Sequence, residues 1–367
     1  MTVKLSHKIR MYPNKSQENY LSRACGVARF TYNWALNEWI TSYKAGEKPN
    51  KFSLKKDFNS IKKEKFPFVT EVTKCASERA FDNLGAAFTN FFRTLKSAKK
   101  KVGFPSFKKK GKSDSFYLAN DQVSIIDTKV KIPKLGLVKL AEQLRFKGKI
   151  LSATVSRKGT HWYISFNMEI AKKDLPKTPA SKNQTVGVDL GLHDLAVLSD
   201  ETTFTGPKPT RKLAGKIRRL SRSLARKKKG SHNRYKAKLK LANMHQRIAN
   251  IRNDYLHKLT TYVANTFEKI AIEDLNVSGM VRNHKLAKAI SDMGWYEFRR
   301  QLTYKTSYKE RMLHVVDRFF PSSKTCSCCG NVKTNLTLAD RIFKCGKCNL
   351  VINRDLNAAF NLELQIL

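Results

Sequence analysis

Apolar residues in the first half of the chain follow two periods. Val3–Met11 alternates as a strand does, and three later segments repeat apolar residues every three or four positions, as amphipathic helices do. These predicted helices cover residues 16–43, 53–61 and 76–98. Short alternating runs between 115 and 170 predict strands, and the clearest hairpin joins 151–155 to 162–168. The simplest assembly is a small β-barrel that carries the helices as an insertion after its first strand.

The second half has the pattern of an α/β unit. A segment of linker composition, 171–184, precedes it. Apolar runs predict a hairpin over Thr185–Ser199 and, within the segment Lys269–Asn276, a buried strand that ends at Glu273. Helices are predicted over residues 211–252, with a break at Gly230–Ser231, and the second of them is expected to continue through Val263. Two more are predicted over 284–318 and in the stretch after 351.

The chain is strongly basic. It carries 72 Lys and Arg residues against 29 Asp and Glu residues, a formal net charge of +43. Such an excess is typical of proteins that neutralise phosphates, so nucleic acid is the expected partner. A membrane is not expected, because no apolar run approaches the roughly 18 residues that a spanning helix needs. The first residues lack the apolar stretch of a signal peptide, and a cytoplasmic or nucleoid-associated protein is expected.

Basic and aromatic residues mark several candidate nucleic-acid contacts. The loop 99–112 is rich in lysine and contains phenylalanines that could stack on bases, with a solvated linker as the alternative. The helices over 211–252 are basic all round, so they are expected to lie along a phosphate backbone, with a solvated arm as the alternative. Polar residues at the start of the 76–98 helix could reach a groove. The candidate contacts are Lys74, Ser77, Glu78, Arg79, Phe104, Phe107, Lys108, Lys109, Arg218, Arg219, Arg222, Arg226, Lys227 and Arg354.

Four of the seven cysteines have the spacing of a zinc ribbon. Cys326 and Cys329 form one C-x2-C pair, Cys345 and Cys348 form another, and fifteen residues separate the pairs. Each pair can ligate one ion from a tight turn, and four thiolates favour Zn²⁺. A redox-active pair is the alternative, and Cys328 could replace one of the ligands.

Three carboxylates are candidates for a catalytic metal site. Asp189 and Glu273 are expected on buried strands and Asp355 near the start of the last helix, while Asp274 is a second choice. Alone, Asp189 could form a salt bridge and Asp355 could cap its helix. Together they make an acidic triad on an RNase H-like frame. Divalent cations make such a cluster tolerable, and two Mg²⁺ or Mn²⁺ ions about 4 Å apart would clamp a phosphodiester for hydrolysis.

Four motifs carry a resemblance to a known family: GVDLGL, IAIEDLN, PSSKTCSCCG and NRDLNAA. In this order and spacing the chain resembles TnpB, the RNA-guided nuclease of bacterial insertion sequences, which is related to compact type V CRISPR effectors. The resemblance implies that Asp189, Glu273 and Asp355 are catalytic and that the four cysteines hold zinc. It also implies a guide RNA from the transposon end and a double-stranded DNA target beside a short flanking motif. Asn353 replaces an Asp that is frequent in the family, and little consequence is expected because Asp355 is intact.

The same resemblance implies a multidomain α+β architecture. A wedge β-barrel (1–14 and 103–178) would carry an inserted helical recognition lobe (15–102). A RuvC-like α/β nuclease domain (182–320 and 350–367) would follow, interrupted by the zinc ribbon (321–349). The protein is expected to be monomeric within its ribonucleoprotein.

Three functions are compatible with these features. An RNA-guided DNA endonuclease is favoured. A guided DNA-binding regulator that does not cut is disfavoured, because all three acidic residues are present. A transposase that performs strand transfer with the same acidic residues is the third.

Overall fold

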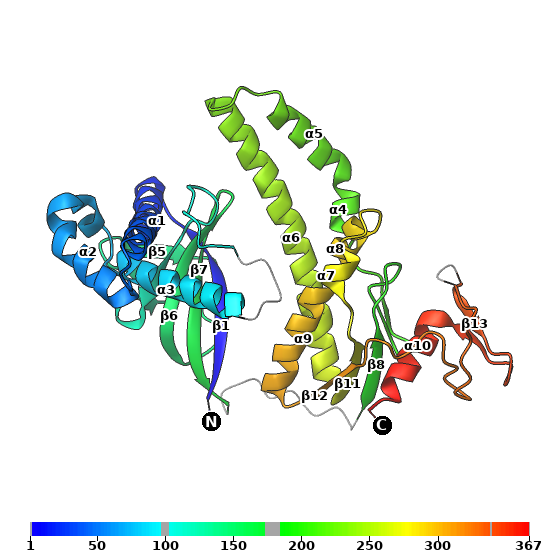
Figure 1. Ribbon diagram of the computed structural model, residues 1–367. Coiled ribbons are helices and arrows are strands. Elements are labelled where there is room, and N and C mark those ends of the chain that lie inside the picture. The colour runs from blue at the N-terminus through cyan, green and yellow to red at the C-terminus, as the bar shows by residue number, and fades with distance from the viewer. Residues whose placement is uncertain (1, 97–102, 173–183, 338–339, 367) are drawn as a thin grey trace. The chain divides into compact units, whose positions relative to one another are not determined.

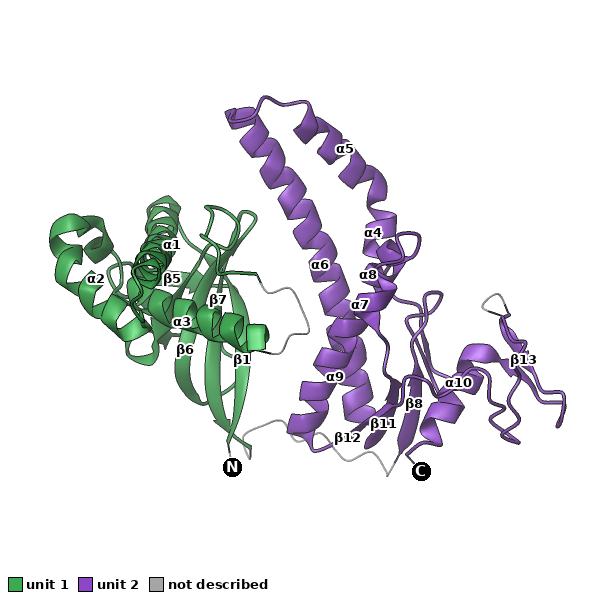
Figure 2. Cartoon of the chain, in the orientation of Figure 1, with its two compact units in different colours: residues 1–175 green, residues 176–367 purple. Residues whose placement is uncertain are grey.

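The chain divides into two units, residues 1–175 and 176–367 (Figure 2). The computed structural model describes residues 2–96, 103–172, 184–337 and 340–366. Most of the predicted linker and part of the predicted basic loop therefore lie outside the described residues. The four predicted domain ranges remain predictions.

The first unit contains an antiparallel sheet of seven strands (Figure 1). Its strands are β1 (Thr2–Tyr12), β2 (Ser115–Ala119), β3 (Ser124–Ile126), β4 (Lys129–Ile132), β5 (Gly136–Leu140), β6 (Lys149–Lys158) and β7 (His161–Ala171). They lie in the order β2-β6-β7-β1-β5-β4-β3. Every second residue of β7 from Trp162 to Ile170 is buried, which is the period that predicted the strand. No pairing joins β2 to β3 in the described residues, so closure into a wedge barrel remains a prediction.

Three α-helices between β1 and β2 share one hydrophobic core with the sheet. They are α1 (Lys15–Lys44), α2 (Lys51–Lys65) and α3 (Cys75–Lys96). A capping box of Asn14 and Gln17 fixes the start of α1. Trp39 of α1 stacks on Phe88 of α3, with 4.1 Å between the ring centroids. The three helices predicted from periodicity are confirmed, with small changes at their ends.

A mixed sheet of five strands forms the centre of the second unit. Its strands are β8 (Thr185–Asp189), β9 (Ala196–Leu198), β10 (Thr203–Phe204), β11 (Lys269–Glu273) and β12 (Met312–Val316). They lie in the order β10-β9-β8-β11-β12. β8 is antiparallel to β9 and parallel to β11, which is parallel to β12. The parallel pairs place the ends of β8 and β11 at the same edge of the sheet.

Helices cover both faces of this sheet (Figure 1). They are α4 (Pro209–Lys212), α5 (Ala214–Ala225), α6 (His232–Thr266), α7 (Val277–Met280), α8 (Ala287–Met293), α9 (Trp295–Lys309) and α10 (Arg354–Glu363). Ile270 and Ile272 of β11 join the core formed with α6 and α9. Ala271, between them, faces the other way and packs with Leu362 of α10. The alternation therefore places α6 and α9 on one face and α10 on the other.

The basic segment predicted over 211–252 forms a projecting helical hairpin of α5 and α6 (Figure 1). α6 continues to Thr266 and carries the chain into β11, as the periodicity predicted. Within the described residues, no helix combines the length and apolar character that crossing a bilayer requires.

One sequence prediction is wrong in this unit. The segment 284–318 was predicted to be helical throughout, but α9 ends at Lys309 and Met312–Val316 is the edge strand β12. Glu310 ends the helix with a positive φ of 58°. Lys305 of α9 is buried, and its ammonium donates hydrogen bonds to the His257 carbonyl and the Thr260 hydroxyl, which offset the cost of burying the charge.

Candidate active site

The three predicted catalytic carboxylates come from elements that meet at one edge of the five-stranded sheet. Asp189 is the last residue of β8 and Glu273 the last residue of β11. These strands are parallel neighbours with Val188 opposite Ile272, so both carboxylates leave the sheet at the same edge. Asp355 lies in the first turn of α10, which packs against both strands.

A glycine allows α10 to approach β8 closely. A Cβ at Gly187 would lie 1.9 Å from the carbonyl oxygen of Ala359 and 2.6 Å from the backbone nitrogen of Glu363. No other residue type fits that space without moving the helix. Asp355 is one turn from Ala359, so this contact sets the position of Asp355 relative to β8.

The carboxylates influence one another electrostatically. Burial raises the pKa of Asp189 well above its ordinary value, and the negative charges of Glu273 and Asp355 raise it further. Burial also raises the pKa of Glu273, although the Ser322 hydroxyl and the Arg354 guanidinium act in the opposite direction. The fold therefore brings the three carboxylates into one electrostatic cluster, and their catalytic role stays a prediction.

Positive charge near the cluster is sparse for so basic a protein. Arg354 and Arg341 each lie 3.9 Å from a carboxylate oxygen of Asp355. Within the described ranges, neither Asp189 nor Glu273 forms an ion pair, so the salt-bridge interpretation of Asp189 finds no partner. Asp274 differs, because it pairs with Arg299 and Arg318, and these interactions lower its pKa. The uncompensated charge of the cluster is what divalent cations would balance.

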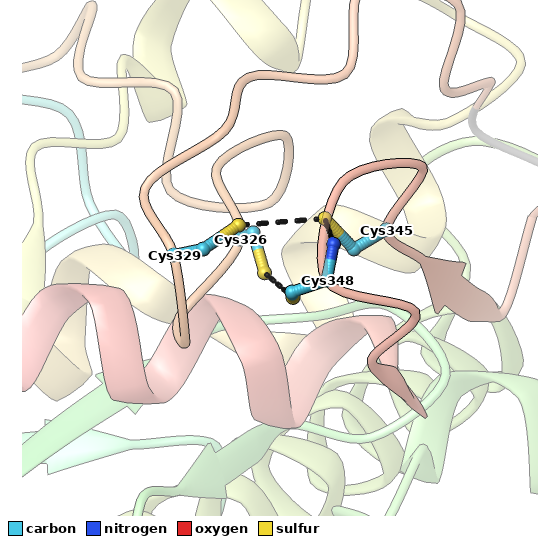
Figure 3. A group of neighbouring side chains, drawn as sticks. All are labelled: Cys326, Cys329, Cys345 and Cys348. Atoms are coloured by element: carbon cyan, nitrogen blue, oxygen red, sulfur yellow. Dashed lines mark hydrogen bonds between the residues drawn. The ribbon is translucent and has the colours of Figure 1, made fainter.

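The four predicted cysteines form a second cluster (Figure 3). Their sulfur atoms all lie within 4.8 Å of one another, and the pairs Cys326–Cys348 and Cys329–Cys345 are 3.6 Å apart. Tetrahedral Zn²⁺ with bonds of about 2.3 Å needs sulfurs about 3.8 Å apart, so the spacing fits zinc. Cys328 is exposed and outside this group.

The two C-x2-C turns have matching backbones. In each, the N–H of the first cysteine donates to the carbonyl five residues later, at 2.9 Å. The residue after the second cysteine has a positive φ, 70° at Gly330 and 58° at Asn349, and glycine and asparagine adopt this conformation most readily. Backbone N–H groups of Cys348 and Lys347 lower the pKa of Cys345 to about 6, which favours the thiolate that a metal binds. A short hairpin of β13 (Ile342–Lys344) and β14 (Val351–Asn353) then leads from the cluster into α10.

The candidate contacts in the first unit differ in accessibility. Arg79 and Lys108 line a groove of about 1070 Å³ together with Phe107 and Lys109. Arg79 stacks on Tyr117, and Lys108 lies 4.0 Å from the centre of the Tyr32 ring.

The other candidates of this unit lie outside that lining. Lys74 is exposed and forms an ion pair with Asp121, whereas Ser77 is buried and donates to the Lys74 carbonyl. Phe104 packs edge-on against Phe88, and Glu78 is partly buried.

Most candidates of the second unit lie on the surface of the helical hairpin. Arg218, Arg219, Arg222 and Arg226 are exposed, and Lys227 is partly buried. Arg354 is turned inward instead. Its guanidinium donates to the carbonyls of Thr337 and Asp340.

Sequence reasoning missed three polar residues between the two clusters. Ser322 donates to a carboxylate oxygen of Glu273 at 2.7 Å. Asn357 and Asn361 of α10 bond to the backbone around Cys326. The signal in the sequence was a pair of asparagines, Asn357 and Asn361, which lie four residues apart among the apolar residues of the last helix.

Family models match three parts of the chain. A "Probable transposase" family matches residues 165–284, a "Cas12f1-like, TNB domain" family matches 295–362, and a "Helix-turn-helix domain" family matches 1–48. A solved structure, "Cryo-EM structure of the Cas12f1-sgRNA-target DNA complex", aligns with a TM-score of 0.57 at 13% identity and covers 99% of both chains. At this identity the likeness concerns the fold alone.

Two curated relatives align with nearly the whole chain. A Streptomyces pristinaespiralis protein named "Putative RNA-guided DNA endonuclease" is 35% identical over 373 residues, which cover 98% of this chain and 89% of that protein. "Putative RNA-guided DNA endonuclease InsQ" of Escherichia coli K12 is 33% identical over 375 residues, covering 97% and 90%. These matches confirm the resemblance seen in the sequence motifs, and the chain belongs to the TnpB family.

Proposed function

We propose that this protein is an RNA-guided DNA endonuclease of an insertion sequence. It would cut DNA that pairs with a guide RNA from the transposon end, beside a short flanking motif. The observation that carries the proposal is the gathering of Asp189, Glu273 and Asp355, distant in the chain, into one cluster of mutually repelling carboxylates. The names of the Streptomyces and Escherichia coli relatives support the same activity.

The acidic cluster fits divalent cations with oxygen ligands. Within the described residues, the cysteines alone form a group of three or more potential ligands within 4.8 Å of one another, so the carboxylates are spaced more widely than the ligands of one ion. Two Mg²⁺ or Mn²⁺ ions, when bound, would supply an activated water and stabilise the leaving oxygen of a phosphodiester.

The residues of the chain would hold this site in place. Asp189, Glu273 and Asp355 would be the carboxylate ligands, and Ser322 would orient Glu273 through its hydroxyl. Arg354 would moderate the negative charge, because it lowers the pKa of Asp189 and Glu273. The four cysteines would hold Zn²⁺, whose sulfur ligands keep it apart from a site built of oxygen.

We propose the finer architecture on the same basis. The sheet order β10-β9-β8-β11-β12 with α10 on one face supports a RuvC-like nuclease domain interrupted by the zinc ribbon. The antiparallel sheet with its inserted helices supports a wedge barrel and a recognition lobe. The protein would act as a monomer in the bacterial cytoplasm.

The charge of the chain supports two nucleic-acid partners. A net charge of +43 suits a guide RNA and a guide–target duplex, which together offer more phosphates than a short DNA site. The exposed arginines of α5 and the groove beside Arg79 and Lys108 would contact them. Sequence specificity would then lie in base pairing.

The test is guided cleavage by the purified ribonucleoprotein. RNA that copurifies with the protein is sequenced, and DNA matching its variable end is added with Mg²⁺. Parent protein should cut this DNA, and Asp189→Ala should bind it without cutting. A parent that binds matched DNA but never cuts would indicate a guided regulator. A parent with no discrete RNA would favour a strand-transfer transposase.

A further inference from the structure

Three buried polar side chains connect the cysteine cluster to the acidic cluster. Ser322, Asn357 and Asn361 are 4%, 0% and 2% exposed. Burial of such groups is costly unless they are hydrogen-bonded, and each of the three makes good hydrogen bonds. Ser322 belongs to the segment 322–327, and Asn357 and Asn361 form hydrogen bonds with that segment.

Asn357 forms hydrogen bonds with the backbone on both sides of the first cysteine, Cys326. Its side-chain amide donates to the Thr325 carbonyl at 2.7 Å, and its side-chain oxygen accepts from the Ser327 N–H at 3.0 Å. Cys326 lies between these two backbone groups. The direction in which Cys326 presents its sulfur is therefore tied to α10.

Asn361 lies one turn further along the same face of α10 and forms hydrogen bonds with the same segment. Its amide donates to the carbonyls of Thr325 and Ser322, at 2.6 and 2.8 Å. The hydroxyl of Ser322 then donates to Oε1 of Glu273 at 2.7 Å. Four hydrogen bonds thus fix the segment to α10, and a fifth fixes Glu273 to the segment.

We infer that the zinc ribbon sets the geometry of the acidic cluster, with Ser322, Asn357 and Asn361 as positioning residues. The segment 322–327 carries the first cysteine ligand, holds the carboxylate of Glu273 and is bound to the helix that bears Asp355. Closing the cysteine cluster around its ion fixes this segment. The separation of Glu273 and Asp355 is fixed with it.

The positioning role of Ser322 follows from the way hydrogen bonds orient metal ligands. A carboxylate whose oxygen accepts a hydrogen bond from Ser322 is restrained in its rotation, so Glu273 is held in one orientation. Loss of partners of this kind typically costs about 10–100-fold in metal affinity or activity. The inference rests on the proposed function for its effect on cleavage, but its effect on metal binding can be measured without cleavage.

The experiment compares Ser322→Ala with Ser323→Ala in the full-length protein bound to its guide RNA. Ser323 is the adjacent serine and has no hydrogen bond to the acidic cluster in the part of the chain that the structure describes. Mn²⁺ affinity is measured by titration of free Mn²⁺ in electron paramagnetic resonance, and single-turnover cleavage is measured as a function of Mn²⁺ concentration. Zinc content, RNA content and binding of matched DNA are recorded for each protein.

The Ser322→Ala protein should retain its zinc, RNA and DNA binding but lose about 10–100-fold in Mn²⁺ affinity. The Ser323→Ala protein should match the parent. Unchanged Mn²⁺ affinity and cleavage in Ser322→Ala would overturn the inference. If the parent itself does not cut DNA, the proposed function fails, while the Mn²⁺ titration still tests the positioning role.

A second variant tests the link to the ribbon. Asn361→Ala removes two bonds to the segment without touching either cluster. It should weaken both zinc retention against a chelator and Mn²⁺ affinity, each by several-fold. Weaker zinc retention with unchanged Mn²⁺ affinity would contradict the coupling between the zinc ribbon and the acidic cluster. Weaker Mn²⁺ affinity with unchanged zinc retention would contradict it as well.

Discussion

Gly187→Ala is expected to disable cleavage through a single added methyl group. Gly187 lies in the middle of β8, two residues before Asp189, and α10 crosses its backbone directly. The substitution leaves every carboxylate and cysteine of the chain in place. Any loss of cleavage must therefore come from a change in the packing of α10 against β8.

The size of the effect follows from the packing distances. The new Cβ would lie 1.9 Å from the Ala359 carbonyl oxygen, about 1.5 Å short of the 3.4 Å at which ordinary contact begins. Ala359 offers a backbone atom, so no change of rotamer can relieve the clash and α10 and β8 must move apart. Asp355 on α10 is thereby displaced relative to Asp189 on β8. A displacement of about 1 Å at a reacting site can cost 100-fold in rate, and overpacking costs about 1–3 kcal/mol in stability.

The assay is single-turnover cleavage of guide-matched DNA at saturating Mg²⁺, alongside a thermal melt. Gly215→Ala is the matched control, because nothing lies within 4 Å of the Cβ it would add to helix α5. The control should cut like the parent and gain up to about 1 kcal/mol in stability from helix propensity. Gly187→Ala should lose at least about 100-fold in cleavage while retaining its RNA. Parental cleavage in Gly187→Ala would refute the claim that close packing of α10 places Asp355.

Three further outcomes are expected. Burial and its acidic neighbours raise the pKa of Asp189, so its ionisation destabilises the metal-free fold as pH rises above the ordinary carboxyl pKa of about 3.9. Asp189→Asn should therefore raise the Tm at pH 7 in magnesium-free buffer but not near pH 3, and equal Tm values at pH 7 would contradict this. Cys345→Ser should lower the zinc content below that of the parent and reduce the yield of folded protein, as elemental analysis would show; unchanged zinc would count against the ribbon. Replacing Arg218, Arg219 and Arg222 together by Ala should reduce the slope of log RNA affinity against log salt by roughly 2, whereas an unchanged slope would show that this face of α5 does not bind phosphates.

Local patterns in the sequence predicted the parts of the site that depend on spacing or period. The C-x2-C pairs specify the cysteine cluster, because a tight turn places both sulfurs of a pair on one side. The apolar runs around Asp189 and Glu273 predicted buried strands, and the structure confirms both. The helix that bears Asp355 follows from the period of its apolar residues.

The remaining features depend on contacts between distant segments. Nothing local indicates that β1 pairs with β7, or that Gly187 faces the backbone of α10. Met312–Val316 was assigned to a helix because helical periodicity runs directly into it, and only pairing with β11 makes it a strand. The hydrogen bond from Ser322 to Glu273 spans 49 residues and leaves no periodic signal.

Anomalous diffraction from crystals of the guide-bound protein soaked in Mn²⁺ would test the central claim most directly. The account predicts Mn²⁺ peaks within bonding distance of the carboxylates of Asp189, Glu273 and Asp355, and the loss of at least one peak in Asp189→Ala. Mn²⁺ bound elsewhere in a protein that still cuts matched DNA, with no peak beside these three residues, would contradict it.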